Sequence, residues 1–233
     1  MGLSSRCRLP ITMSLLWKLK AELAQAPDIL PRDKFMLWSA FTLAFFGFLR
    51  SSEFTSPSTS HFNALSHLSG ISFNSDGSLS LHLKSSKTDP YRQGCSLLIA
   101  PSGQSICAVR AIRKYMAHHP FNLDGPIYTF QSGLYLTRTQ VTSPLCLLLK
   151  RLHIPTELYA SHSFRIGAAT TAAKAGLPPW LNQTLGRWSS NCFALYIRTP
   201  SSILQKVPGL LANAAAGTQS IWNPQEGCCT HLT

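Results

Sequence analysis

A chain of 233 residues, 45% of them hydrophobic, can bury a sizeable core, which excludes a disordered chain and fits one domain or two closely packed lobes. Its 21 Lys and Arg residues outnumber nine Asp and Glu residues and give a formal net charge of +12; within 91–225 the acids are only Asp124 and Glu157. This excess favours a polyanion such as nucleic acid as partner, with an acid-poor soluble protein as the alternative, since only 13% of the residues are charged.

Two helices are predicted at the start of the chain. Apolar residues at helical spacing predict a helix that Thr12 caps and that runs to Gln25. Pro31 opens a second helix, and its apolar run over 35–49 predicts burial nearly all round. Arg50 follows directly, so this helix is expected to support it, either as a functional cation or as an ordinary cationic helix end.

After Gly70 the pattern changes to a period of two and predicts a small antiparallel sheet. Apolar and polar residues alternate over 71–83 around an Asp-Gly turn, and a third strand is expected at 95–100. The connection over 84–94 is predicted to be an exposed loop, and three cations lie in it: Lys84, Lys87 and Arg92. The sheet is too small for a dinucleotide-binding fold, and no phosphate-loop motif occurs.

The second half of the chain is predicted to be helical. Pro144 is expected to restart or kink one of these helices. Ser161 is expected to cap a helix of small residues that ends before the Pro178-Pro179 pair. The other helices are predicted over 105–118, 137–152 and 203–216. The fold class is therefore α+β, a mainly helical chain with a small three-stranded antiparallel sheet.

Four residues between 160 and 196 form the candidate site. His162 and Arg165 lie three apart, so in a helix that starts at Ser161 their side chains are neighbours on the first turn. That turn favours anions, because unpaired N–H groups and the helix dipole are joined by a guanidinium. Trp188 and Tyr196 follow in short segments. Each residue alone has an ordinary interpretation as a surface or core side chain, and the ordered set favours a shared site.

This ordered set resembles the catalytic domain of the tyrosine recombinases, also called the phage integrase family. The matching residues come in the family's order: Arg50 in Leu-Arg-Ser-Ser-Glu, Lys87 in Ser-Lys-Thr, His162 with Arg165, Trp188 and Tyr196. Segments such as Ala-Phe-Phe-Gly-Phe-Leu-Arg are most similar to recombinases of DIRS-like retrotransposons. The resemblance covers about 10–200, and the Trp-to-Tyr interval is one residue shorter than in many bacterial members.

The resemblance implies DNA cleavage and rejoining through a 3′-phosphotyrosine, without metal or other cofactor. It implies that Tyr196 is the nucleophile and His162 its base. It also implies that Lys87 protonates the leaving 5′ oxygen, with Lys84 as the rival. Three groups are expected on the scissile phosphate: Arg50, Arg165 and the Trp188 indole. Glu53 is expected to support Arg50. Further DNA contacts are expected from Lys84, Arg92, Arg187 and Arg198.

The expected layout is a leader at 1–9, a catalytic domain at 10–207 and a flexible tail at 208–233. The family's N-terminal core-binding domain is expected to be absent. The expected partners are double-stranded DNA and further copies of the chain, as a dimer or tetramer on DNA. No membrane partner is expected, because the apolar run over 37–49 is too short to span a bilayer. Seven cysteines without an export signal indicate an intracellular protein, nuclear in a eukaryote.

Three functions fit these predictions. The leading hypothesis is a strand-exchange recombinase of a mobile element, or of a gene derived from one. A DNA-binding remnant without catalysis is the main alternative, and the expected absence of the front domain favours it. A relaxing enzyme similar to type IB topoisomerases shares the chemistry. DDE-type transposases and two-metal nucleases are disfavoured, because the nine acids are scattered along the chain.

Overall fold

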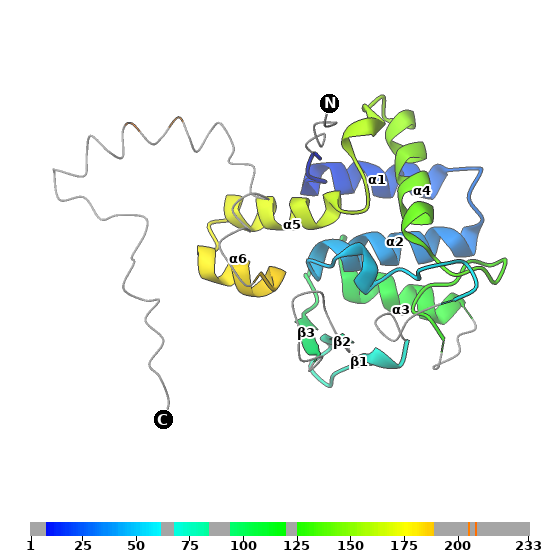
Figure 1. The fold of residues 1–233 in the computed structure, drawn as a ribbon, viewed down its shortest axis with the longest axis horizontal. Coiled ribbons are helices and arrows are strands. Elements are labelled where there is room, and N and C mark those ends of the chain that lie inside the picture. The colour runs from blue at the N-terminus through cyan, green and yellow to red at the C-terminus, as the bar shows by residue number, and fades with distance from the viewer. Residues whose placement is uncertain are drawn as a thin grey trace, which may run out of the picture.

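The computed structural model describes residues 8–61, 68–83, 94–119 and 125–188, together with Gln205 and Pro208. Within these ranges six α-helices and a three-stranded antiparallel sheet are present, which confirms the predicted α+β class (Figure 1). The helices are α1 (Met13–Gln25), α2 (Pro31–Phe46), α3 (Ala108–His118), α4 (Arg138–Arg151), α5 (Ser163–Lys174) and α6 (Pro179–Gly186). The strands are β1 (Ile71–Phe73), β2 (Leu79–Leu83) and β3 (Cys95–Ile99).

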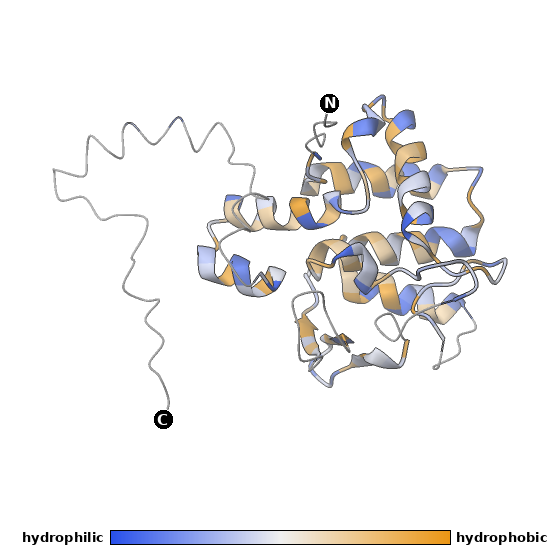
Figure 2. Cartoon of the chain, viewed as in Figure 1, coloured by the Kyte–Doolittle hydropathy of each residue, from blue (hydrophilic) through white to orange (hydrophobic). Residues whose placement is uncertain are grey.

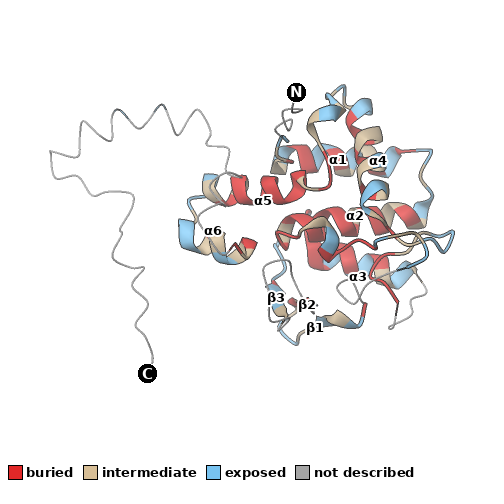
Figure 3. Cartoon of the chain, viewed as in Figure 1, coloured by how far each residue is buried: buried red, intermediate tan, exposed pale blue. Residues whose placement is uncertain are grey.

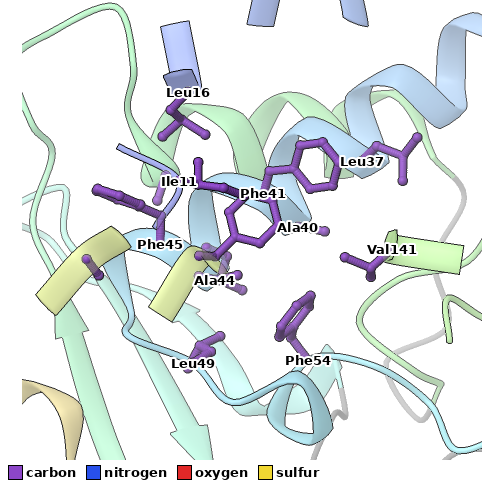
Figure 4. Packing of buried hydrophobic residues seen from close by; sticks show 14 of the residues in the cluster. Ile11, Leu16, Leu37, Ala40, Phe41, Ala44, Phe45, Leu49, Phe54 and Val141 are labelled. Carbon is purple, nitrogen blue, oxygen red and sulfur yellow. The ribbon is translucent and has the colours of Figure 1, made fainter. Parts of the chain in front are cut away.

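Helix α2 forms the centre of the core. Most of its residues are buried on every side, as the apolar run predicted, and α1, α3 and α5 pack around it (Figure 3). Phe41 and Phe45 of α2 belong to the same buried cluster as Leu49 and Phe54 (Figure 4). The Phe41 ring also lies 4.9 Å, between centroids, from the ring of Phe164 in α5. The core therefore fixes α5 against α2.

The end of α2 sets the position of Arg50. The Leu49 N–H donates to the Ala44 carbonyl at 3.0 Å and the Phe48 N–H donates to the Phe45 carbonyl at 3.2 Å, which is a Schellman helix end. In this turn Phe48 has a φ of 49°, a left-handed conformation in which glycine is usual and a bulky side chain is strained. The turn ends the helix at Phe46 and sends the chain toward Arg50.

The sheet has the strand order β1-β2-β3, with all neighbours antiparallel. Leu81 in the central strand pairs with Ile71 on one side and with Leu97 on the other. The β1–β2 connection is the predicted turn, in which Gly77 has a φ of 82° and Asp76 accepts a hydrogen bond from the next serine. The three predicted strands are thus confirmed.

Two helix predictions need correction. Helix α3 begins at Ala108 and not at Ser105, because Cys107 before it is extended. It is two-sided as predicted, with its apolar residues inward and its basic residues outward (Figure 2). Helix α4 continues through Pro144 as one element, so the predicted restart is wrong, while the predicted kink stays a prediction. A proline removes only one helical hydrogen bond, and the capping box at Thr137 fixes the start of this helix independently.

Ser161 does not cap α5 as predicted. Its hydroxyl is fully buried and has no hydrogen-bond partner among the described residues. The chain makes a turn over 160–163 in which the Ser163 hydroxyl accepts from the Ala160 N–H at 3.1 Å. This turn places His162 at the N-cap position, with helical backbone angles, directly before the helix.

The segment before α1 crosses α5 at Gly167. The Ile11 N–H donates to the Ser163 carbonyl at 3.0 Å, and a Cβ atom on Gly167 would overlap the Ile11 carbonyl oxygen. Backbone lies against backbone here, so only glycine fits. The crossing fixes the helix that carries Arg165.

Replacing Gly167 by alanine is therefore expected to destabilise the fold by roughly 2 kcal/mol or more. Overpacking against backbone outweighs the gain in helix propensity, which is about 1 kcal/mol. Denaturant unfolding measures the change. The control is Ala173→Gly in the same helix, which should cost only about 1 kcal/mol. An unchanged unfolding midpoint for Gly167→Ala would show that the crossing is loose.

Candidate functional site

The candidate site lies where three separate segments of the chain meet. These are the C-terminal end of α2 with the short 3-10 turn η1 (Ser51–Glu53) that follows it, the start of α5, and the C-terminal end of α6. Figure 1 shows α5 and α6 as neighbours at one end of the molecule. Helix C-terminal ends carry partial negative charge on unpaired carbonyl groups. Guanidinium groups bind these carbonyls. The site is therefore a cluster of arginines that donate hydrogen bonds to a set of backbone carbonyl oxygens, which we call the frame.

Arg50 is held by Glu53. Its Nη1 donates to Glu53 Oε1 at 3.0 Å, and its backbone N–H donates to Oε2 at 2.8 Å. Its Nη2 donates to the carbonyl oxygen of Arg187 at 3.3 Å. Glu53 is only 1% exposed, and a carboxylate at that depth needs charged partners. The Arg50 guanidinium is therefore fixed at both terminal nitrogens, while 18% of its side chain is exposed.

Arg165 is buried on the other side of the same frame. Its Nη1 donates to the Phe48 carbonyl at 2.7 Å and its Nη2 donates to the Gly186 carbonyl. The strained turn at Phe48 directs that carbonyl to the guanidinium. Arg165 thus joins the ends of α2 and α6.

Trp188 covers the guanidinium of Arg165. The centre of its ring lies 4.3 Å from the guanidinium carbon, a cation–π contact, and its edge meets the ring of Phe48. A Cβ atom on Gly186 would overlap the indole, so the ring depends on this glycine. The ring helps to hold Arg165, and donation of the indole N–H to phosphate stays a prediction.

Arg187 lies inside this frame as well. It ends α6 with a φ of 54°, and its side chain is 11% exposed. Its Nη2 forms a 2.6 Å ion pair with Glu53 Oε2. The predicted contact of Arg187 with DNA stays a prediction, but the structure shows it bound to protein groups.

His162 stands beside these arginines as a neutral imidazole. Burial is the main cause that lowers the pKa of His162 to about 4. Three nearby positive charges lower this pKa further: those of Arg165, Arg138 and Arg50. An imidazole that is neutral at pH 7 has the free lone pair that a general base needs, and a pKa of about 4 makes it a weak base.

The lowered pKa of His162 predicts a loss of stability in acid. The unfolded state takes up the proton below about pH 6.5 and the folded state only near pH 4, so the loss grows as the pH falls through that window. Between about pH 8 and pH 5 the protein should lose about 1–2 kcal/mol more than the His162→Gln variant. Denaturant unfolding at both pH values measures this. An NMR titration midpoint of His162 near 6.5 would contradict the assigned burial.

Five predicted site residues lie outside the described residues: Lys84, Lys87, Arg92, Tyr196 and Arg198. The structure brings together the others, which come from positions 50 to 188 of the chain.

Two kinds of site group were missed from the sequence. Backbone carbonyls of Phe48 and Gly186 bind Arg165, and no residue type marks such acceptors. Arg138 is exposed at the first turn of α4 and close enough to influence His162. A cation at a helix N-terminus opposes the helix dipole. This unfavourable placement could have indicated from the sequence that Arg138 belongs to the site.

A cavity of about 460 Å³ lies away from this cluster, between α1, α2 and α3. The first half of α2 lines it, whereas Arg50 follows the other end of that helix. In the parts of the chain that the structure describes, no three His, Cys, Asp or Glu side chains are grouped to hold a metal ion. None of the described helices is long and apolar enough to cross a membrane.

Neither a protein-family model nor a curated protein sequence matches this chain. Solved structures do match it. The XerH site-specific recombinase, bound to a palindromic difH substrate after cleavage, superposes with a TM-score of 0.64 over 91% of this chain at 12% identity. The XerA recombinase gives 0.64 over 90% at 11% identity, and the Tn1549 transposon integrase with circular intermediate DNA gives 0.55 over 90% at 16% identity.

The chain has the fold of a tyrosine recombinase catalytic domain. It spans 55% of the length of the XerH chain and 65% of the XerA chain. At such identities the likeness establishes the fold and leaves the chemistry to the residues of the site. In this recombinase fold the arginine cluster lies where α2, α5 and α6 converge.

Proposed function

We propose that this chain cleaves and rejoins DNA strands through a covalent 3′-phosphotyrosine intermediate. The main support is the cluster in which Arg50 and Arg165 are fixed beside the neutral His162. A phosphodiester under attack gains negative charge on its non-bridging oxygens, and fixed guanidinium groups stabilise that charge. The net charge of +12 favours DNA as the source of the phosphate.

In this proposal the Tyr196 oxygen attacks the scissile phosphorus and gives its proton to His162. The bond between phosphorus and the 5′ oxygen breaks, and Lys87 protonates that oxygen as it leaves. The starting phosphodiester and the phosphotyrosine diester each carry one negative charge, and one ester bond replaces another, so the bond energy is stored in the phosphotyrosine. Rejoining is the reverse reaction with another 5′ hydroxyl group, and it needs neither ATP nor metal.

Tyr196 can reach the cluster. It follows Trp188 by eight residues, and an extended chain of that length spans at most about 28 Å. Trp188 itself lies on Arg165, so the connection from Trp188 to Tyr196 begins inside the site. The length of the connection therefore permits the phenol to reach the phosphate.

The proposed setting is DNA recombination or integration by a mobile element, or by a gene derived from one. The match to a transposon integrase supports this setting, and a DIRS-like origin is the finer proposal. We also propose a catalytic domain at 10–207, a tail at 208–233, assembly as a dimer or tetramer on DNA, and nuclear location in a eukaryotic host. The proposed DNA contacts outside the described residues are Lys84, Arg92 and Arg198.

The test is a covalent-trapping assay with the full chain. A duplex with a nick near the cleavage site loses a short 5′ fragment on cleavage, so the reaction cannot reverse and the adduct accumulates. The expected result is a protein–DNA band that survives SDS and disappears after protease treatment. Binding without any such band, at low salt and high protein concentration, would show a DNA-binding remnant and overturn the proposal. Relaxation of a single supercoiled plasmid, with no strand exchange between two sites, would indicate a topoisomerase-like activity instead.

A further inference from the structure

We infer that Arg187 is a positioning residue that holds Arg50 in place, and not a contact of DNA. This inference rests on the proposed function, because it assigns Arg50 to the scissile phosphate. The reasons are the bonds of Arg187 and the charge of the cluster.

Arg187 holds Arg50 in place through two interactions. Its carbonyl oxygen accepts from Arg50 Nη2 at 3.3 Å, and its Nη2 binds the same Glu53 carboxylate that binds Arg50 Nη1. Each terminal nitrogen of Arg50 is therefore oriented by an acceptor that belongs to Arg187 or is bonded to it. The left-handed conformation of Arg187 brings its carbonyl and its side chain to the same cluster, although that conformation is unfavourable for a residue with a Cβ atom.

Arg187 also links the two phosphate-binding arginines. Its Nη2 lies 3.3 Å from the Phe48 carbonyl, which is the acceptor of the shorter bond from Arg165 Nη1. A shift of Arg187 would release the Phe48 carbonyl and change the positions of both Arg50 and Arg165, the two residues of the phosphate clamp. Arg187 is thus bonded to Glu53, to the Phe48 carbonyl and to Arg50 at once.

The charge of the cluster depends on Arg187. Glu53 alone would neutralise Arg50 and leave that pair with no net charge. With Arg187 the three groups carry +1, and Arg165 raises the sum to +2. Because the carboxylate is buried, its charge is weakly screened, so the second guanidinium keeps the potential at Arg50 attractive for phosphate.

Direct contact of Arg187 with DNA is disfavoured because each of its terminal nitrogens already donates to two protein acceptors. Its two terminal nitrogens donate to four protein acceptors: Gly47 O, Leu185 O, Phe48 O and Glu53 Oε2. Its Nε is buried and has no partner among the described residues. Arg138, by contrast, is exposed near the same site.

Binding and cleavage separate the two roles. Fluorescent duplexes titrated across a salt series give the affinity and the log-log salt slope, and trapping at saturating protein gives the cleavage rate. Arg187→Gln is expected to keep the salt slope, to weaken binding slightly through the lost charge, and to cleave roughly 100-fold more slowly. Arg138→Gln serves as the comparison for a phosphate contact and should reduce the slope by about 0.9. Arg187→Lys keeps the positive charge but lacks the two terminal nitrogens of a guanidinium. Its cleavage rate should therefore lie between those of the wild type and Arg187→Gln.

A reduced salt slope for Arg187→Gln, like that of Arg138→Gln, would overturn the inference and identify a DNA contact. Failure of the proposed function looks different, because the wild-type chain then forms no adduct at all. In that case an unfolding cycle of Arg50→Gln, Arg187→Gln and the double variant decides. Coupling of about threefold or more in the unfolding equilibrium constant supports positioning, and additive effects refute it. Unfolding curves of each variant also show whether a slow rate reflects a lost fold.

Discussion

A chain with Tyr196 replaced by phenylalanine is expected to bind DNA as tightly as the wild type and to form no covalent adduct. The change removes one oxygen atom, so the phosphate clamp and the basic surface stay intact while the nucleophile is lost. Trapping on a nicked duplex, read as the SDS-stable band, together with a binding titration, measures both effects. The loss should be complete, because the change removes the oxygen atom at which the phosphotyrosine bond is proposed to form.

Other tyrosines are poor substitutes for physical reasons. Burial raises the pKa of Tyr115 to about 12 and raises that of Tyr128 further, so neither phenol ionises readily in the core. Burial also raises the pKa of Tyr159. Tyr135→Phe is the matched control, since this partly exposed residue lies outside the cluster and should leave the adduct unchanged. An adduct that persists in Tyr196→Phe would refute the assignment of the nucleophile.

Arg165→Lys should lower the cleavage rate by about 30-fold or more, which corresponds to roughly 2 kcal/mol of transition-state stabilisation. The guanidinium donates to the carbonyls of Phe48 and Gly186 from two nitrogens, and its flat face lies against an indole. A lysine ammonium has a single nitrogen and no flat face, so it cannot keep these contacts and also address a phosphate oxygen. Single-turnover trapping at saturating protein measures the rate.

The matched control is Lys174→Gln, an exposed cation at the last turn of the same helix. It should change binding slightly and leave the cleavage rate unchanged. An unfolding curve for Arg165→Lys distinguishes a folded but slow variant from one that has lost the cluster. An unaltered cleavage rate in folded Arg165→Lys would show that Arg165 does not stabilise the scissile phosphate.

Local patterns were sufficient for most of the fold. Burial of α2 on all sides followed from its apolar run, and the strands followed from alternation around the Asp76-Gly77 turn. These features depend on residues close together in the chain, which is why periodicity shows them. The start of α5 could not be read in this way, because Ser161 and Ser163 are both good caps and tertiary packing chose the turn that Ser163 closes.

The sequence by itself determined the α+β class, the order of the elements and the residue types that resemble a recombinase site. Only the tertiary structure decided how these residues are used. It placed Arg187, expected on DNA, against Glu53 and Arg50, and it made backbone carbonyls at Phe48 and Gly186 the partners of Arg165. The physical reason is that such bonds join residues more than 100 positions apart or use the backbone, so no local pattern records them. Burial of His162, and the approach of Arg138 and Arg50 from other parts of the chain, also arise only when the chain has folded.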